Sequence, residues 1–199
     1  MATLADIDLV LASTSVYRRE LLARLGAAFR QQSPQVDETA LASETPAELA
    51  ARLAAAKAHA VAASNPNALV VGSDQVADCE GHILGKPGDI DNARGQLRAS
   101  SGRQVRFHTG VCLVDTRESP AREFYALDTT TVVFRNLDEA EIGRYLARET
   151  PFDCAGSFKS EGLGIALFER IESQDPTAII GLPLIALCRL LREAGIEVL

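Results

Sequence analysis

Ala68-Leu-Val-Val-Gly-Ser-Asp-Gln-Val76 joins a run of apolar residues to a run of small and polar ones. The apolar run, which is rich in valine, predicts a buried β-strand. Ligands of open α/β sheets bind at the carboxyl ends of strands, so a strand that ends here makes Asp74 the first candidate for chemistry. A turn that starts at Ser73 is the alternative, and this stretch by itself leaves both open.

Composition limits the classes of protein that the chain can belong to. Its 199 residues are 47% hydrophobic, enough for a full core in one domain or in two tightly joined lobes. No window approaches eighteen consecutive apolar residues, which predicts no membrane span. The first ten residues lack the basic and apolar regions of a secretory signal, so we expect a cytoplasmic protein.

The charge and the metal-binding residue types exclude two further classes. A net charge of -7 argues against a nucleic-acid surface, although a few Lys and Arg in one cleft can still bind a polyanion when a cation bridges them. The four cysteines are far apart and the three histidines have no ligand spacing. We therefore expect reduced, structural thiols and no zinc site.

The first strand and helix enclose a candidate phosphate site. Asp8–Ala12 predicts a strand, Ser13-Thr14-Ser15 follow it, and a helix runs from Tyr17 to Gly26 with Arg18 and Arg19 in its first turn. Two arginines are unfavourable at a helix N-terminus unless an anion joins them. Hydroxyls, free N–H groups and arginine together predict a phosphate cradle. A plain serine N-cap with two solvated arginines is the alternative.

Other charged residues lie in positions that suit a phosphate site. Asp37 and Glu38 place two carboxylates in a polar loop, and Mg²⁺ prefers one or two carboxylates together with phosphate oxygens. The capping box Thr45-Pro-Ala-Glu48 predicts a helix that reaches about Ala63 and carries Lys57, which by itself says little. Lys86 stands between a glycine and a proline, so its backbone is constrained and its side chain can be aimed.

The remaining pattern predicts a mixed sheet with helices, and therefore an α/β fold. Ala155–Gly164, with Lys159 and Glu161, is too polar for a core strand and predicts a functional loop. The other expected elements are a hairpin around Glu80-Gly81, a helix from Asp89 to about Ser100, strands at Arg103–His108, Val111–Asp115 and Phe124–Phe134 with a turn at Thr109-Gly110, a helix from Asp138 to Arg148, strands at Ile165–Ile171 and Ala178–Ile180, and a helix from Gly181 to Glu193.

Taken together, these pieces resemble the Maf family of nucleoside triphosphate pyrophosphatases. The resemblance runs in order from about Leu9 to the last helix, and the ordered set is far more specific than any one motif. The matching pieces are Leu11–Arg19, Glu20–Leu22, Val36–Glu38, Arg52-Leu53, Ala56–Ala58, Gly72–Gln75, Gly85–Pro87, Ser101-Gly102, Thr109-Gly110, Ala155-Gly156, Glu161-Gly162 and Gly181–Pro183.

The resemblance implies a single Maf-like (ITPase-like) domain, an elongated mixed sheet flanked by helices, with two lobes around a central substrate cleft. It also implies hydrolysis of a nucleoside triphosphate to the monophosphate and pyrophosphate with a divalent cation, Mg²⁺ or Mn²⁺. Asp74 matches the general base, Ser13, Ser15 and Arg18 the phosphate-binding turn, and Glu38, Lys57 and Lys86 the remaining polar residues of the cleft.

This implied reaction agrees with the chemistry of the residues. Attack on an α-phosphorus needs an in-line water, a base and neutralisation of the triphosphate. Arg18, Lys57 and Lys86 are the expected phosphate contacts. A cation held by Glu38 would bridge the phosphates, and Asp74 is a metal ligand, the base, or both.

Three residues indicate the base of the substrate: Tyr17, Gln75 and Glu161. They resemble the subclass that hydrolyses 7-methyl-GTP, although that subclass often has tryptophan where Tyr17 stands. A carboxylate accepts from both N1–H and the 2-amino group of guanine, which favours Glu161 as its partner. N7-methylation makes the base cationic, and an aromatic face stabilises a stacked cation by about 0.5–2 kcal/mol.

Two alternatives remain beside this hypothesis. The first is the same enzyme class acting on dTTP, UTP or another modified nucleotide. The second is a nucleotide-binding regulator of cell division with little turnover. A P-loop ATPase or kinase is disfavoured, because the chain has no G-x-x-x-x-G-K-[ST] motif. A homodimer is expected from base rates alone.

Overall fold

The computed structural model describes residues 2–199 and has a mixed α/β fold. The chain divides into two compact units. The first unit comprises the chain up to Asp74 together with Thr109–Asp128 and Asp175–Leu199, and the second comprises Gln75–His108 and Thr129–Gln174. The prediction of a central cleft between two lobes stays a prediction. No helix among the described residues is long and apolar enough to cross a membrane.

The helices and strands follow the predicted order closely. The strands are β1 (Ala2–Thr3), β2 (Leu9–Ala12), β3 (Arg30–Gln32), β4 (Leu69–Cys79), β5 (His82–Leu84), β6 (Gln104–Asp115), β7 (Arg122–Phe134), β8 (Phe168–Glu172) and β9 (Ile196–Glu197). The α-helices are α1 (Val16–Ala23), α2 (Pro46–Ala62), α3 (Ile90–Ser100), α4 (Glu139–Arg148) and α5 (Leu184–Glu193). The 3₁₀ helices are η1 (Leu4–Asp6), η2 (Ala155–Ser157), η3 (Leu163–Leu167) and η4 (Ala178–Ile180).

The main sheet is mixed, as expected. Its strand order is β3-β2-β4-β6-β7-β8, and β5 pairs with β4. Strand β2 is parallel to both β3 and β4, whereas β5 is antiparallel to β4 and β8 is antiparallel to β7. The short strands β1 and β9, which the sequence pattern did not predict, form a separate parallel pair.

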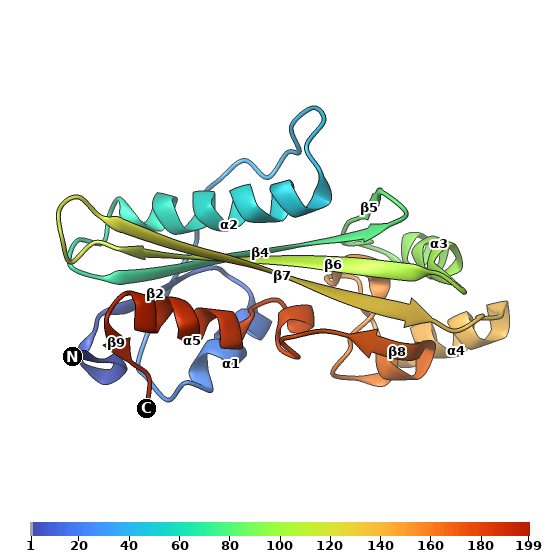
Figure 1. Ribbon diagram of the computed structural model, residues 1–199. Coiled ribbons are helices and arrows are strands. Elements are labelled where there is room, and N and C mark those ends of the chain that lie inside the picture. The colour runs from blue at the N-terminus through green and yellow to red at the C-terminus, as the bar shows by residue number, and fades with distance from the viewer. Residues whose placement is uncertain (1) are drawn as a thin grey trace. The chain divides into compact units, whose positions relative to one another are not determined.

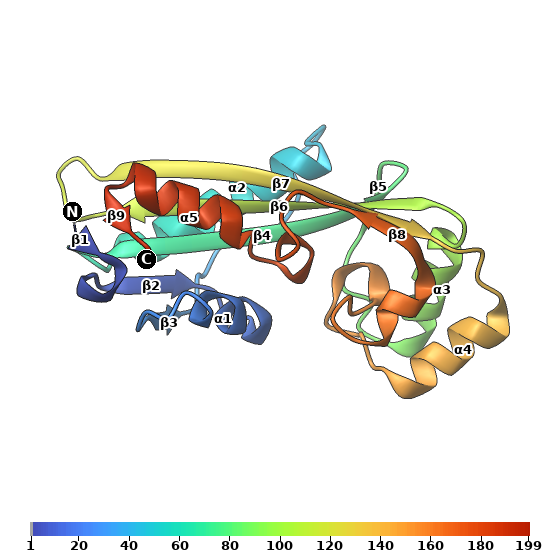
Figure 2. The same cartoon turned by 60° about the horizontal axis from the view of Figure 1, so that its bottom comes forward.

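In the first unit, helix α2 covers one face of the sheet, and α1 and α5 cover the other (Figure 1, Figure 2). Strand residues alternate between these two layers. Leu9 and Leu11 of β2 pack in the cluster with α1 and α5. Val10 and Ala12 pack instead in the cluster with α2. This alternation explains why both strands at the centre of the unit are apolar on both faces.

Two strand glycines let α2 lie very close to the sheet. A Cβ atom on Gly72 of β4 would lie 2.4 Å from the carbonyl oxygen of Ala54, and one on Gly110 of β6 would lie 2.7 Å from that of Ala50. Glycine inside a strand often marks such a close backbone approach. The predicted turn at Thr109-Gly110 is therefore wrong, because β6 runs straight through both residues.

Three other local predictions need correction. The strand expected to begin at Ile165 begins at Phe168, because Ile165–Leu167 belong to the 3₁₀ helix η3. Strand β4 does not end at Asp74 but continues to Cys79, so the residues of the Gly72–Gln75 motif lie within the strand. Ser73 and Asp74 are buried rather than exposed at a strand end. The segment Ala178–Ile180, predicted as a strand, is the 3₁₀ helix η4, because its apolar residues line a short turn before α5. The helices predicted from capping residues begin as expected.

The second unit has its own aromatic core. Phe107, Phe134, Phe158 and Phe168 form a chain of edge-to-face contacts with ring centroids 4.7–5.6 Å apart. This geometry is the favoured one for aromatic pairs. Helices α3 and α4 add apolar side chains, among them Leu97 and Ile142, which are fully buried. The unit therefore has a hydrophobic core that is independent of the layers of the first unit.

Gly72→Ala is predicted to destabilise the protein, because the new methyl group would collide with backbone atoms of α2. We expect the free energy of unfolding to fall by at least about 2 kcal/mol. The matched control is Gly95→Ala in α3, where a Cβ meets nothing within 4 Å. Alanine there should stabilise the helix by about 0.5–1 kcal/mol. Denaturant unfolding of both variants measures the difference, and similar stabilities would contradict the close approach.

Candidate active site

A lysine on α2 joins two carboxylates from different parts of the first unit. The Nζ atom of Lys57 lies 2.5 Å from Oδ1 of Asp74 and 2.6 Å from Oε1 of Glu38. The side chains of Lys57 and Asp74 are 7% and 10% exposed, whereas that of Glu38 is 60% exposed. The result is a buried ion pair with an exposed acid at its solvent edge, and all three residues were predicted for the site.

Strand alternation explains why Asp74 faces Lys57. Gly72 faces α2, so the residue two positions later faces α2 as well. Ser73 lies on the opposite face, where its Oγ is 2.7 Å from the carbonyl oxygen of Gly110 and 2.9 Å from that of Gly181. One hydroxyl proton thus ties β4 to β6 and to the segment before α5. The close packing of α2 at Gly72 brings Lys57 within reach of Asp74.

The predicted turn of serines and arginine forms as expected at the start of α1. Ser15 is the N-cap of the helix, and its Oγ accepts a hydrogen bond of 3.3 Å from the backbone N–H of Arg18. The Oγ of Ser13 accepts from the N–H of Ser15 at 3.1 Å. The first turn holds no acidic residue, and the half-buried Tyr17 lies in it beside Arg18. The positive end of the helix dipole is therefore not neutralised by the helix itself.

Arg18 is fixed from the other side by the segment that precedes α5. Its Nε donates a 2.8 Å hydrogen bond to the carbonyl oxygen of Gly181. Burial lowers the pKa of the Arg18 guanidinium from its ordinary value, and the negative charges of Asp74 and Glu38 oppose that shift. Arginine stays protonated at neutral pH even so. Arg18 is thus electrostatically coupled to both carboxylates that Lys57 binds.

The charges of this cluster balance within the protein itself. Arg18 and Lys57 supply two positive charges, and Glu38 and Asp74 supply two negative ones. Among the residues that the structure describes, no group of three or more His, Cys, Asp or Glu side chains could hold a metal ion. Two carboxylates still suit Mg²⁺, which commonly takes one or two of them and completes its shell with water and phosphate oxygens.

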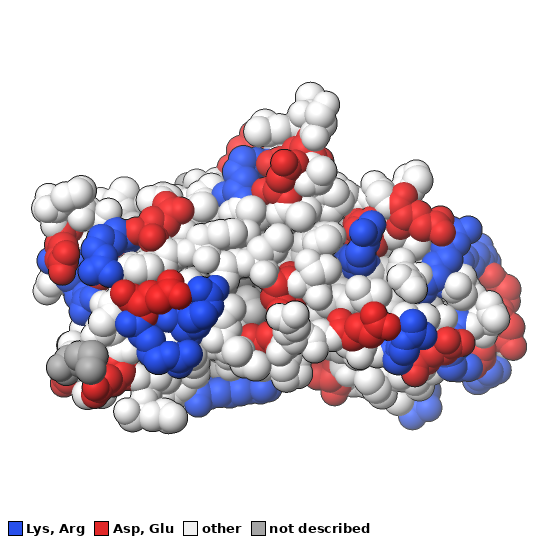
Figure 3. Space-filling view, viewed as in Figure 1, with Lys and Arg blue, Asp and Glu red and all other residues white. Residues whose placement is uncertain are grey.

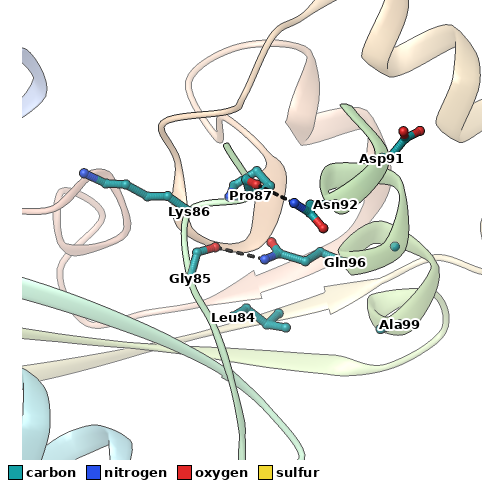
Figure 4. A pocket seen from close by; sticks show the side chains of 9 residues that line it. Leu84, Gly85, Lys86, Pro87, Asp91, Asn92, Gln96 and Ala99 are labelled. Atoms are coloured by element: carbon teal, nitrogen blue, oxygen red, sulfur yellow. Dashed lines mark hydrogen bonds between the residues drawn. The ribbon is translucent and has the colours of Figure 1, made fainter. Parts of the chain in front are cut away.

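Lys86 lies in the second unit, on a loop that helix α3 holds in place (Figure 4). The carbonyl oxygen of Gly85 accepts from the amide of Gln96 at 3.0 Å, and that of Pro87 accepts from the amide of Asn92 at 3.1 Å. The loop and one face of α3 line a pocket of about 470 Å³. The exposed side chain of Lys86 extends away from these lining residues, so the lysine is presented outward from a fixed backbone.

Gln75 and Glu161 also belong to the second unit. Gln75 directly follows Asp74 in β4 and is half-buried, with its side chain direction set by the strand. Glu161 is exposed, and its Oε2 accepts a 3.2 Å hydrogen bond from the hydroxyl of Ser160. The structure thus brings Glu38, Lys57 and Asp74 into contact and couples Arg18 to the two carboxylates. That Lys86, Gln75 and Glu161 join them around one substrate stays a prediction.

Sequence reasoning missed the parts played by Ser73 and Gly181. A turn at Ser73 was left open as an alternative, and Gly181 was predicted to start a helix. In the structure the carbonyl oxygen of Gly181 accepts from both Arg18 and Ser73. Asp175 fixes the same segment, because its side chain accepts from the backbone N–H groups of Thr177 and Ile185. The alternation of side chains along the strand could have indicated this, because it places Ser73 on the face of the sheet opposite to that of Gly72 and Asp74.

On the face of the molecule shown in Figure 3, lysines and arginines lie interspersed with aspartates and glutamates, and no continuous basic stripe crosses that face. A surface that binds the backbone of nucleic acid needs clustered positive charge. That the protein does not bind nucleic acid, which the net charge of -7 suggested, stays a prediction.

The fold and these residues define an α/β protein in which a turn of serines and arginine lies near a buried carboxylate–ammonium pair. A family model described as "Maf-like protein" matches residues 8–194. The chain belongs to the Maf family, as the sequence motifs predicted.

Curated relatives extend along nearly the whole chain. A protein from Xanthomonas oryzae pv. oryzae named "7-methyl-GTP pyrophosphatase" is 60% identical over 187 residues, which are 94% of this chain and 96% of the relative. A protein of the same name from Nitrosococcus oceani is 54% identical over 98% of this chain and 97% of its own length. The solved structure of the Staphylococcus aureus Ham1 protein is similar in fold, with a TM-score of 0.52 at 14% identity over 94% of this chain and 99% of that one.

The two partners of Lys57 are predicted to differ in their energetic coupling to it. A double-mutant cycle with Lys57→Met and Asp74→Asn should give a coupling of about 2–4 kcal/mol in the free energy of unfolding, because the pair is buried. The matched cycle with Glu38→Gln should give less than about 1 kcal/mol, because Glu38 is exposed. Equal coupling energies would show that burial does not determine how strongly Lys57 is coupled to each carboxylate.

Proposed function

We propose that this protein is a nucleoside triphosphate pyrophosphatase that hydrolyses 7-methyl-GTP to 7-methyl-GMP and pyrophosphate. The observation that carries the proposal is the buried Asp74, held by Lys57 and coupled electrostatically to Arg18. This combination gives a carboxylate for water activation next to cations for phosphate. The names of relatives that are 54–60% identical over nearly the full chain support the same reaction and substrate.

The candidate site residues of the first unit have distinct tasks in the proposed reaction. The turn of Ser13 and Ser15 supplies hydroxyls and helix N–H groups to the phosphates, and Arg18 adds a guanidinium whose direction Gly181 fixes. Asp74 accepts a proton from the water that attacks the α-phosphorus in line. Lys57 donates a hydrogen bond from its Nζ to Oδ1 of Asp74 and so keeps the carboxylate in its orientation.

A divalent cation, Mg²⁺ or Mn²⁺, fits the carboxylates of this cluster. Glu38 and Asp74 already converge on one positive charge, the ammonium of Lys57, and are the residues that would hold the cation. When bound, it would neutralise triphosphate charge as a Lewis acid. The protein's own charges here already balance, so a triphosphate needs added positive charge. Lys86 on its fixed loop is the protein's further contribution.

Tyr17, Gln75 and Glu161 would select the base. Glu161 offers an exposed carboxylate that can accept from both donors of a guanine edge. A methylated, cationic guanine gains further from a negative carboxylate and from stacking on an aromatic ring such as that of Tyr17. We further propose that the protein works in the cytoplasm as a homodimer and removes modified nucleotides from the pool.

The substrate assignment is tested by pyrophosphate release from four nucleotides. We expect 7-methyl-GTP to be hydrolysed well ahead of GTP, dTTP and UTP when Mg²⁺ or Mn²⁺ is supplied, because a carboxylate favours a cationic base. Chelation of the cation should abolish turnover of all four, since the triphosphate would then lack its counter-charge. Faster turnover of dTTP or UTP would instead assign the chain to a pyrimidine-specific enzyme of the same family.

Asp74→Asn is predicted to remove turnover and to spare much of the nucleotide binding. Loss of a general base costs about 100-fold or more in kcat, while the amide keeps the size of the side chain. Calorimetric titration with a non-hydrolysable nucleotide measures the binding, and Asp6→Asn in η1 is an exposed control. Near-normal turnover in Asp74→Asn would refute the role of base. Absence of turnover in the wild-type protein would favour a nucleotide-binding regulator.

A further inference from the structure

Two side chains at the end of helix α4 hold the loop that carries Glu161. The hydroxyl oxygen of Tyr145 accepts a 3.2 Å hydrogen bond from the backbone N–H of Lys159. Oε1 of Glu149, the residue that ends the helix, accepts a 2.9 Å hydrogen bond from the N–H of Leu163. Glu161 lies midway between these two anchored positions. Its backbone is therefore tied to α4 two residues before it and two residues after it.

The packing of this loop leaves little room for another conformation. A Cβ atom on Gly162 would lie within 2.3 Å of Oε1 of Glu149, so the carboxylate lies directly against the loop backbone. A Cβ atom on Gly164 would lie 2.4 Å from the carbonyl oxygen of Lys159, so the loop also closes on itself. A side chain at position 162 would push the loop away from Glu149, and one at position 164 would open the loop's own contact with Lys159.

Tyr145 is a buried anchor, and Glu149 is a half-buried one with one carboxylate oxygen fully buried. Tyr145 is 6% exposed, and burial raises the pKa of its hydroxyl, so the phenol stays neutral at physiological pH. Oε2 of Glu149 is buried and has no hydrogen-bond partner among the described residues. A buried polar atom without a partner costs about 1–3 kcal/mol and calls for an explanation. Holding the loop with the other carboxylate oxygen supplies one.

We propose that Glu149 and Tyr145 are positioning residues for the selection of the base: they fix the loop so that the carboxylate of Glu161 is presented in one place. The inference rests on the proposed function, in which Glu161 binds the edge of a guanine-like base. A loosely held carboxylate would have to be ordered on binding, at a cost in affinity. Loss of an anchor should therefore weaken base selection without changing the chemistry at the phosphates.

The experiment compares kcat and KM for 7-methyl-GTP and GTP in a set of variants. Glu149→Ala should lower the 7-methyl-GTP to GTP ratio of kcat/KM at least fivefold, an effect of about 1 kcal/mol, through a higher KM for 7-methyl-GTP with little change in kcat. Glu149→Gln keeps an acceptor oxygen and should restore most of the ratio. Tyr145→Phe should lower it in the same direction. Arg148→Ala, an exposed neighbour on α4, is the matched control.

Coupling to Glu161 separates positioning from a general loss of structure. Glu161→Gln alone should lower the ratio, and adding Glu149→Ala to it should have almost no further effect, because the anchor acts through Glu161. Thermal unfolding of each variant verifies that it folds. Should Glu149→Ala fail to fold, Tyr145→Phe and Glu149→Gln still test the proposal.

The outcomes distinguish this inference from the proposed function. If Glu161→Gln loses the preference for 7-methyl-GTP while Glu149→Ala and Tyr145→Phe keep it, the positioning role is overturned and the proposed function stands. Additive losses in the double variant, or an equal fall in kcat for both nucleotides, also overturn it. If the wild-type protein itself shows no preference, the substrate assignment fails first.

Discussion

The contact between helix α2 and the sheet at Gly72 and Gly110 is the constraint on which the candidate active site depends. Because neither residue has a side chain, backbone atoms of α2 approach both strands. That approach sets the distance from the helix to β4 and so places Lys57 against Asp74. A bulkier strand would raise the helix and leave a carboxylate buried without a partner, which costs several kcal/mol. The close packing of α2 on the sheet is therefore also what allows the carboxylate of Asp74 to be paired with Lys57.

The same close packing determines how the charges of the candidate site are paired. A buried carboxylate is tolerated only when it is paired and hydrogen-bonded, and Lys57 supplies that pairing for Asp74. Glu38 approaches the same ammonium from a loop and stays exposed, which suits the role proposed for it in holding a cation beside a triphosphate. Arg18 is fixed independently by Gly181, on the other face of β4. The cluster thus combines a rigid acid–ammonium pair with one exposed acid.

The features that depend on a few adjacent residues could be predicted from the sequence, and those that depend on distant contacts could not. The N-cap at Ser15 and the capping box at Thr45 formed as expected, because each is decided within one turn of helix. The residues around Lys57 gave no indication of its role, because its partner Asp74 lies on a strand seventeen positions further along the chain. Gly110 was wrongly assigned to a turn, because glycine marks both turns and close approaches, and only the packed helix separates these.

Hydrolysis and base selection, as proposed for this protein, depend on side chains that are held in place in different ways. The acid–ammonium pair lies on a strand and a helix, where alternation and packing fix each direction. Glu161 lies on a loop, and a loop holds a side chain in one place only if other groups fix its backbone. Tyr145 and Glu149 fix the backbone of this loop from the end of α4. In doing so Glu149 keeps its Oε2 atom buried without a hydrogen-bond partner among the described residues. Under the proposed function, substitutions around α4 would alter which base is accepted while the Asp74–Lys57 pair keeps its geometry, because the two supports share no residue.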